Sequence, residues 1–268
     1  MINVQDEYRG LLSGIFHGGP QKEDRTGTGT RSVFGRILRH DMAGGFPLLT
    51  AKKIYFNHAL TEILWILQGR TDLAYLHKFG VNYWDDNYNK SGRTDGTLGP
   101  VYGQQLRNFI GVDQLETILE QIKKEPSSRR IVASLWNPAD MRNMALPPCH
   151  YGFQVYINSG KLSLSWNQRS VDVFLGLPYD IAMYGLLLLM LAKGNGYEPG
   201  TLVAHLGDCH LYNNHMDAAM EYLNREDGIL PEVNIKKGLS LDGPIPRHSD
   251  FELINYNPQK PIKAPLAT

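Results

Sequence analysis

The chain has little cysteine and no excess charge of either sign. Its 268 residues include two cysteines, Cys149 and Cys209, so no disulfide framework is implied and a reducing compartment is the simpler expectation. Lys and Arg together number 27, as do Asp and Glu, with no polybasic arm or polyacidic tail. Nothing in this balance indicates a nucleic-acid polymer or an anionic membrane as partner. A phosphate pocket built from separate arginines remains compatible with it.

Secretion and membrane signals are also scarce. The N-terminus lacks the basic region and apolar core of a secretory leader, so we expect a cytoplasmic protein. The single long apolar run, residues 174–194, is interrupted early by Gly176, Pro178 and Asp180. Its remainder is about 12 residues, roughly 18 Å as a helix, against a hydrocarbon thickness of ~30 Å. The run therefore predicts a buried core helix.

Hydrophobic periodicity predicts mixed secondary structure. Apolar residues follow helical spacing over residues 4–16, 56–68 and 115–123, and a long buried helix is expected near 178–193. Strands are expected at residues 129–136, in HYGFQVYI and KLSLSWNQRS on either side of an NSG turn, and at residues 202–205. We find no repeat or linker, so residues 1–268 are expected to form one domain, and the order of elements favours an α+β fold or a mixed-sheet α/β layer fold.

Two Gly- or Pro-rich segments lie outside these elements. GRTDGTLGP, residues 92–100, predicts a surface loop, and three prolines in the last twelve residues exclude a terminal helix. Composition alone favours a frayed tail.

Cys149 lies in ALPPCHYG, directly before His150. A thiolate is a nucleophile when nearby positive charge or a base lowers the thiol pKa from about 8.5. Free cysteine is equally typical of a buried, small apolar side chain, so both interpretations stay open. His150 need not be the base, because adjacent strand residues point to opposite faces.

Arginine recurs beside Gly, Thr or Ser in DRTGTGT, SSRRIV and NQRSVD. A guanidinium binds phosphate oxygens in a fork, and a neighbouring hydroxyl adds a donor. No segment has the spacing of a Walker or dinucleotide-binding loop. Singly, each is typical of a solvated charge. Together they indicate a phosphate site made of Arg25, Arg129, Arg130, Arg169 and Ser170.

Two carboxylates stand in apolar surroundings, Glu62 in ALTEILWILQG and Asp180 in FLGLPYDIAMYG. A part-buried Glu has a raised pKa that suits acid–base chemistry, although a helix-surface Glu is the commoner case. If Pro178 begins a helix, Asp180 lies in its first turn and complements the helix dipole without any ligand. Local sequence favours that explanation.

Three histidines, one Cys and one Asp lie within HLGDCHLYNNH, residues 205–215. The segment lacks the CxxC and HExxH spacings of zinc sites, so no metal is expected. His210 and Tyr212 are two residues apart and so share one face of a strand, which favours hydrogen bonding to a polar ligand.

Taken in order, these segments resemble the thymidylate synthase family over nearly the whole chain. The matching segments are DRTGTGT, GFPLLTAKK, LWILQG, LGPVYG, SSRRIV, PPCH, QRSVDVFLGLP, DCHLYNNHMD and IKAPLAT. The resemblance implies a large mixed sheet covered by helices and a sheet-to-sheet homodimer whose sites each borrow two arginines. It also implies one-carbon transfer from 5,10-methylenetetrahydrofolate to a pyrimidine deoxynucleotide.

The resemblance further implies a role for each matched residue. Cys149 would add to C6 of the pyrimidine, Glu62 would organise water and proton transfers, and Tyr102 would lie near the nucleophile. The 5′-phosphate of the nucleotide would be held by Arg25, Arg169 and Ser170 of one subunit together with Arg129 and Arg130 of the other. The 3′-hydroxyl would be bound by His210 and Tyr212. The folate side would include Lys52, Trp84, Asp172, Leu175, Gly176, Tyr179 and Ala267. The tail would then be a closing flap.

Asp180 departs from the family pattern, in which an asparagine reads the uracil edge. Uracil presents an acceptor at O4 and a donor at N3, which an amide complements, whereas cytosine reverses both. A carboxylate accepts from the cytosine amine and, with a shared proton, also answers N3. In this residue the chain resembles the deoxycytidylate (dCMP) hydroxymethylases, which would release 5-hydroxymethyl-dCMP and tetrahydrofolate.

The sequence indicates which pyrimidine base the substrate carries, but it leaves open whether the product bears a hydroxymethyl or a methyl group. Asn87 stands where the synthases have a second tryptophan, and Thr268 replaces an apolar terminal residue. Both make the folate side more polar and favour water, whereas the retained Trp84 favours hydride transfer. A dCMP methyltransferase or a thymidylate synthase acting on dUMP therefore remains an alternative. More distant alternatives are a thiol hydrolase or acyltransferase and an inactive nucleotide- or RNA-binding protein.

Overall fold

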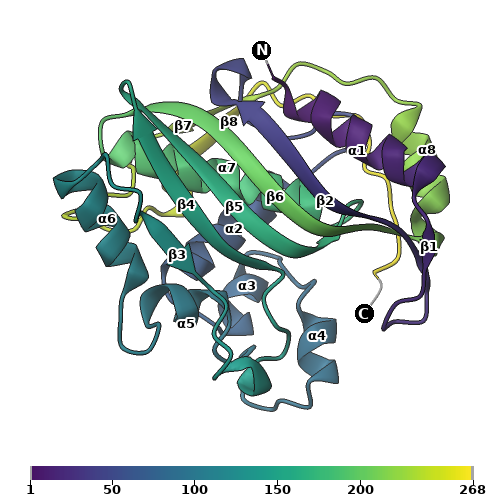
Figure 1. The fold of residues 1–268 in the computed structure, drawn as a ribbon, viewed down its shortest axis with the longest axis horizontal. Coiled ribbons are helices and arrows are strands. Elements are labelled where there is room, and N and C mark those ends of the chain that lie inside the picture. The colour runs from purple at the N-terminus through teal and green to yellow at the C-terminus, as the bar shows by residue number, and fades with distance from the viewer. Residues whose placement is uncertain (1, 267–268) are drawn as a thin grey trace.

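A six-stranded mixed sheet organises the protein, for which the computed structural model describes residues 2–266 (Figure 1). Its strand order is β1-β2-β6-β5-β4-β3, and only β5 and β6 pair in parallel. The strands are β1 Gln21–Lys22, β2 Thr30–Asp41, β3 Val132–Ser134, β4 His150–Asn158, β5 Lys161–Asp172 and β6 Glu198–Tyr212. A separate antiparallel pair consists of β7 Glu232–Ile235 and β8 Phe251–Ile254. The predicted α+β class is confirmed.

Helices fill the connections between the strands. They are α1 Val4–Gly18, α2 Phe56–Leu67, α3 Leu73–Lys78, α4 Asp85–Lys90, α5 Tyr102–Arg107, α6 Gln114–Lys124, α7 Leu177–Gly194 and α8 Met216–Leu223. The periodic segments at residues 4–16, 56–68 and 115–123 correspond to α1, α2 and α6. Asn3 and Asp113 start α1 and α6 by accepting backbone N–H groups, at 2.9 Å from Gln5 and 3.1 Å from Glu116.

The predicted core helix is α7, which connects the parallel strands β5 and β6. It is long and apolar enough to cross a membrane, but 72% of it is buried inside the protein, where it packs against α2, β5 and β6. Gly185 lets the loop before α2 approach α7 closely, since a Cβ at this position would lie 2.7 Å from Cγ of Pro47. Asp180 lies in the first turn of α7, as predicted.

Helices α2 and α7 lie behind the sheet in Figure 1, and the face turned to the viewer carries no helix. Large side chains on β2, β3 and β4 are exposed, namely Phe34, Val132, Tyr151 and Tyr156. A sheet face of this size with large apolar side chains is typical of a surface covered in an assembly. The sheet-to-sheet homodimer stays a prediction, because one chain is described.

Two strand predictions need correction, and one hairpin is confirmed. β4 and β5 form the expected hairpin, with Ser159 and Gly160 both at positive φ. The strand predicted at residues 129–136 is shorter, Val132–Ser134, because Arg129 and Arg130 form a turn before it. The strand predicted at residues 202–205 is the middle of β6, which spans 15 residues between β2 and β5. Pairing on both edges, rather than local apolarity, sets its length.

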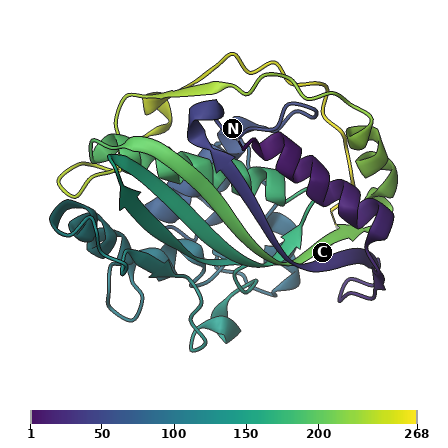
Figure 2. The ribbon, with the colours of Figure 1, turned by 45° about the horizontal axis from the view of Figure 1, so that its top comes forward.

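The described part of the C-terminal tail is docked, so fraying is the wrong expectation for residues 257–266 (Figure 2). The backbone N–H of Gln259 donates to Thr50 at 2.8 Å, and the imidazole Nε2 of His215 lies 2.7 Å from the carbonyl of Pro265. Ala267 and Thr268, which were given roles on the folate side, lie outside the described residues.

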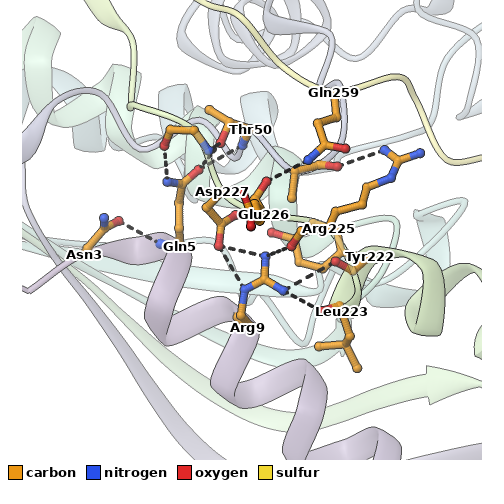
Figure 3. A network of polar contacts seen from close by, with 12 residues as sticks. Asn3, Gln5, Arg9, Thr50, Tyr222, Leu223, Arg225, Glu226, Asp227 and Gln259 are labelled. Atoms are coloured by element: carbon orange, nitrogen blue, oxygen red, sulfur yellow. Dashed lines mark hydrogen bonds and ion pairs between the residues drawn. The ribbon is translucent and has the colours of Figure 1, made fainter.

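A polar network joins the C-terminal tail, at Gln259 and Lys260, to the N-terminal helix α1 (Figure 3). Arg9 of α1 donates to the carbonyls of Leu223 and Arg225 and pairs with Asp227 at 2.8 Å. Arg225 in turn donates to the carbonyls of Ala51 and Lys260. These contacts tie α1, the loop before α2 and the tail into one unit.

Candidate active site

The predicted nucleophile, Cys149, directly precedes β4 and is partly exposed. Its backbone N–H donates to the hydroxyl oxygen of Tyr102 at 3.0 Å, and its carbonyl accepts from the backbone N–H of Arg169 at 2.9 Å. The Arg169 guanidinium is held beside it by the carbonyls of Pro148 and Pro147, at 2.9 and 3.0 Å. The PPC segment thus positions both the thiol and a positive charge.

Burial raises the pKa of the Cys149 thiol to about 11. Arg169 acts in the opposite direction, and the carboxylates of Asp180 and Asp172 raise this pKa further. The thiol is therefore protonated near pH 7 in the unliganded chain, and neutralising Asp180 would favour the thiolate. Cys209 lies inside β6, fully buried, and its pKa is also raised by burial, to about 12.

Asp180 is oriented by Gln168 of β5, which donates from Nε2 to Oδ2 of the carboxylate at 2.8 Å. Burial raises the pKa of Asp180 to about 7, the nearby carboxylates of Glu62 and Asp172 add to the shift, and the Gln168 hydrogen bond opposes it. The carboxyl group therefore takes up or releases a proton near neutral pH. Gly176 lies against it, since a Cβ there would be 3.9 Å from Oδ2.

His150 is occupied by structural contacts. Its Nδ1 lies 2.8 Å from the hydroxyl of Tyr184, and its ring stacks on Tyr102 with centroids 4.3 Å apart. Burial lowers the pKa of His150 to about 3, so the imidazole is neutral. His150 need not be the base for Cys149, as expected from the sequence, because Tyr184 and Tyr102 already engage its ring.

Glu62 projects from α2 with 8% of its surface exposed. Oε2 accepts from the hydroxyl of Tyr83, and Oε1 accepts from the indole Nε1 of Trp84 at 2.9 Å. Burial raises the pKa of Glu62, and both hydrogen bonds oppose that shift. Trp84, expected on the folate side, is therefore anchored to the predicted proton-transfer group.

The predicted sugar- and phosphate-binding residues of this chain gather where β5 and β6 end. Ser170 pairs with Asp208 across the two strands, and Asp172 pairs with His210. The rings of His210 and Tyr212 are 5.2 Å apart. Arg25 is exposed in the 24–29 loop, and its charge acts on the hydroxyl of Tyr212. Together with Arg169, these groups can hold a phosphorylated sugar.

Arg129 and Arg130 are both exposed in the turn before β3. Among residues 2–266, the charges that act on the Cys149 thiol are those of Arg169, Asp180 and Asp172, and neither turn arginine contributes. Their predicted use in a second subunit's site requires the assembly and stays a prediction.

Five predicted folate-side residues lie around the start of α7, namely Lys52, Asp172, Leu175, Gly176 and Tyr179. Oδ1 of Asp172 accepts from the backbone N–H groups of Phe174 and Leu175 at 3.0 and 2.9 Å. Lys52 is 4% exposed, donates to the carbonyl of Phe174, and lies 3.8 Å over its ring. Burial lowers the pKa of Lys52 to about 7.

Several aromatic rings lie beside this cluster. Tyr179 lies 6.4 Å from both His58 and Tyr83, measured between ring centroids, and His58 stacks on the exposed Tyr55. Flat side chains in this arrangement suit an aromatic ligand.

Sequence reasoning did not single out Gln168, Tyr83 or His58. Gln168 lies inside QRSVD, one residue from Arg169, and Tyr83 directly precedes Trp84. Their roles depend on contacts with Asp180 and Glu62, which are 12 and 21 residues away along the chain. Among the described residues, no three His, Cys, Asp or Glu side chains are placed to hold a metal ion.

The thymidylate synthase family model matches residues 6–268. The chain therefore belongs to the thymidylate synthase family. Members of this family transfer a one-carbon unit to C5 of a pyrimidine nucleotide, with methylenetetrahydrofolate as co-substrate. They are generally homodimeric, soluble and cytoplasmic.

Proposed function

We propose that the chain is a dCMP hydroxymethylase, which converts dCMP, methylenetetrahydrofolate and water into 5-hydroxymethyl-dCMP and tetrahydrofolate. The observation that carries the proposal is Asp180, a carboxyl group with a pKa raised to about 7 by burial, whose charge acts on the Cys149 thiol. A group that gains a proton near pH 7 can both donate to cytosine N3 and accept from the cytosine amine.

Gln168 favours the ionised form of Asp180, which can accept from the cytosine amine. The Gln168 side-chain amide donates a hydrogen bond to Oδ2 of Asp180. Each carboxyl oxygen has two lone pairs, so both oxygens of Asp180 can still form a hydrogen bond with the base. In its ionised form, the same carboxyl group would set an acceptor against the O4 acceptor of uracil. A site built around a specific donor or acceptor can reject the mismatched analogue by roughly 10⁴-fold or more.

The reaction needs a nucleophile at C6 and a proton acceptor near C5. The Cys149 thiolate adds to C6, which makes C5 nucleophilic toward the one-carbon unit of the folate. A proton shared between Asp180 and N3 draws electron density from C6 and eases this addition. Loss of the C5 proton and release of the folate leave an exocyclic methylene, to which water adds.

Phosphate recognition fits the residues that gather at the ends of β5 and β6. We propose that Arg25, Arg169 and Ser170 hold the 5′-phosphate, and that His210 and Tyr212 hold the 3′-hydroxyl. Arg129 and Arg130 would complete the phosphate site of a partner subunit that covers the open sheet face. The surface of exposed Phe34, Val132, Tyr151 and Tyr156 supports such a homodimer.

Methyl transfer is the second candidate, and it rests on Trp84. This indole is held in place by its hydrogen bond to Glu62, and a fixed aromatic beside the folate favours hydride over water. A thiol hydrolase is less well supported, because the histidine adjacent to Cys149 is engaged by Tyr184 and its pKa is lowered by burial to about 3, which is unfavourable for a general base.

Parallel assays with dCMP and dUMP labelled with tritium at C5 test whether the enzyme acts on cytosine or on uracil. We expect tritium release from dCMP at a rate at least a hundredfold above that from dUMP, and the reverse order would overturn the assignment. Asp180→Asn should shift preference toward dUMP, whereas Cys149→Ser should abolish release and retain nucleotide binding. Asp242→Asn, which removes an exposed carboxylate, is the matched control.

Product analysis separates the two candidates. The mass of the product nucleotide distinguishes a hydroxymethyl group from a methyl group by one oxygen atom. Only the methyl route also oxidises the folate, so growth of dihydrofolate absorbance would identify it.

A further inference from the structure

Two adjacent side chains hold the Glu62 carboxylate from one side. Tyr83 and Trp84 lie in the turn that leads into α4, and they donate to Oε2 and Oε1 respectively. Because each donor takes a different oxygen, the carboxylate cannot rotate without losing one of them. Two of its roughly four lone-pair sites remain free.

The carboxylate needs such support because of where it lies. Glu62 is on α2 and almost fully buried, so ionisation is unfavourable unless donors solvate the charge. The titratable groups that interact with it are Asp180 and Tyr184 of α7, Tyr102 of α5, and Tyr83 itself. None of these four brings a positive charge.

We propose that Tyr83 is a positioning residue for one-carbon transfer, which holds Glu62 as an oriented carboxylate that accepts the proton of the attacking water. Trp84 donates a hydrogen bond to the other carboxylate oxygen of Glu62, but it also belongs to the predicted folate side. Tyr83 is the partner whose hydroxyl can be removed while its ring is kept. The inference rests on the proposed function.

The step that Glu62 would serve is balanced without an oxidant or reductant. A lone pair of water forms the bond to the exocyclic methylene carbon, and the carbon–carbon π pair moves into the pyrimidine ring. The water proton passes to Glu62. Re-formation of the C5–C6 double bond then breaks the C6–S bond and returns the Cys149 thiolate.

The surroundings of Tyr83 fit a fixed support. Its ring lies 6.4 Å from Tyr179 and 6.3 Å from His58, both measured between centroids. The phenol is half-buried among these rings, so Tyr83→Phe removes the hydroxyl and preserves the packing. Tyr75→Phe is the matched control, because its hydroxyl accepts from Gln68 and does not contact Glu62.

The test follows the Glu62 carboxyl directly, by ¹³C NMR of chain labelled at the Glu side-chain carboxyl and titrated without nucleotide. The Glu62 signal is assigned by its loss in Glu62→Gln. Loss of a hydrogen bond to a charged group is expected to raise the apparent pKa of Glu62 by about one unit or more in Tyr83→Phe. The pKa in Tyr75→Phe should match that of wild type.

Turnover provides the second measurement. The acidic limb of the kcat profile for dCMP should move to higher pH by the same amount in Tyr83→Phe, with KM for dCMP changed less than threefold. An unmoved Glu62 titration, or a fall in kcat at all pH values with no shift of the limb, would overturn the inference. Absence of tritium release from either nucleotide by wild type would instead refute the proposed function, because the NMR titration does not depend on activity.

Discussion

Gln168 donates from Nε2 to Oδ2 of Asp180 at 2.8 Å while its own Oε1 accepts from the indole of Trp166 at 3.1 Å. An indole N–H can only donate, so Trp166 fixes which end of the amide faces Asp180. The orientation of Gln168 is therefore set from the core, where Trp166 stacks on Tyr184 with centroids 4.8 Å apart. Asp180 receives a donor, which suits a carboxylate.

Replacement of Gln168 tests this arrangement. Gln168→Leu removes the donor that favours the charged form of Asp180, so the pKa of Asp180 should rise further and the carboxyl should lose its orientation. We expect kcat/KM for dCMP to fall at least tenfold, in line with one hydrogen bond to a charged group. Gln68→Leu, at the exposed end of α2, is the control and should leave kcat/KM unchanged. Equal effects of both substitutions would contradict the role of Gln168.

Asp180 should also make the stability of the protein depend on pH. Its folded-state pKa is raised from 3.8 to about 7, so the cost of ionisation is absent below about pH 4, grows between pH 4 and pH 7, and is constant above. Asp180→Asn removes this cost. Its stabilising effect in urea unfolding should grow by roughly 2 kcal/mol between pH 5 and pH 8. Asp242→Asn, at an exposed position, should show no such growth.

The two cysteines should differ in reactivity, and the reactivity of Cys149 should follow its neighbours. Cys149 is partly exposed with a pKa raised to about 11 by burial, and Cys209 is buried in β6. Iodoacetamide at pH 8 should therefore alkylate Cys149 slowly and Cys209 not at all, as peptide mass mapping would detect. Asp180→Asn removes a negative charge and should speed alkylation of Cys149, whereas Arg169→Gln should slow it. The opposite order would show that other groups control the thiol.

Local pattern predicted those parts of the fold that depend on one segment alone. The helices α1, α2 and α6 and the β4–β5 hairpin follow from periodicity and turn residues. Strand β2 was missed, because Gly35 at positive φ and several charged residues interrupt its alternation. Its length instead comes from pairing with β6, which lies some 170 residues further along the chain.

The site divides in the same way. Ordered motifs located Cys149, Asp180 and Glu62, because each lies within a recognisable segment. Sequence motifs could not identify the residues that hold Asp180 and Glu62 in place. Gln168 and Tyr83 do so through the direction of a single N–H or O–H group. That direction depends on three-dimensional packing and not on residue type.

The docked tail provides the last prediction. His215 is fully buried, its Nε2 lies 2.7 Å from the carbonyl of Pro265, and its Nδ1 has no hydrogen-bond partner among residues 2–266. His215→Phe keeps a ring of similar shape and removes the only donor that holds this carbonyl in the described chain. Since one hydrogen bond contributes about 1 kcal/mol, digestion of residues 261–266 by a carboxypeptidase should become roughly five- to tenfold faster. His17→Phe, at an exposed position near the end of α1, should not change the rate. An unchanged rate in His215→Phe would mean that the anchors at Thr50 and Arg225 suffice to hold the tail.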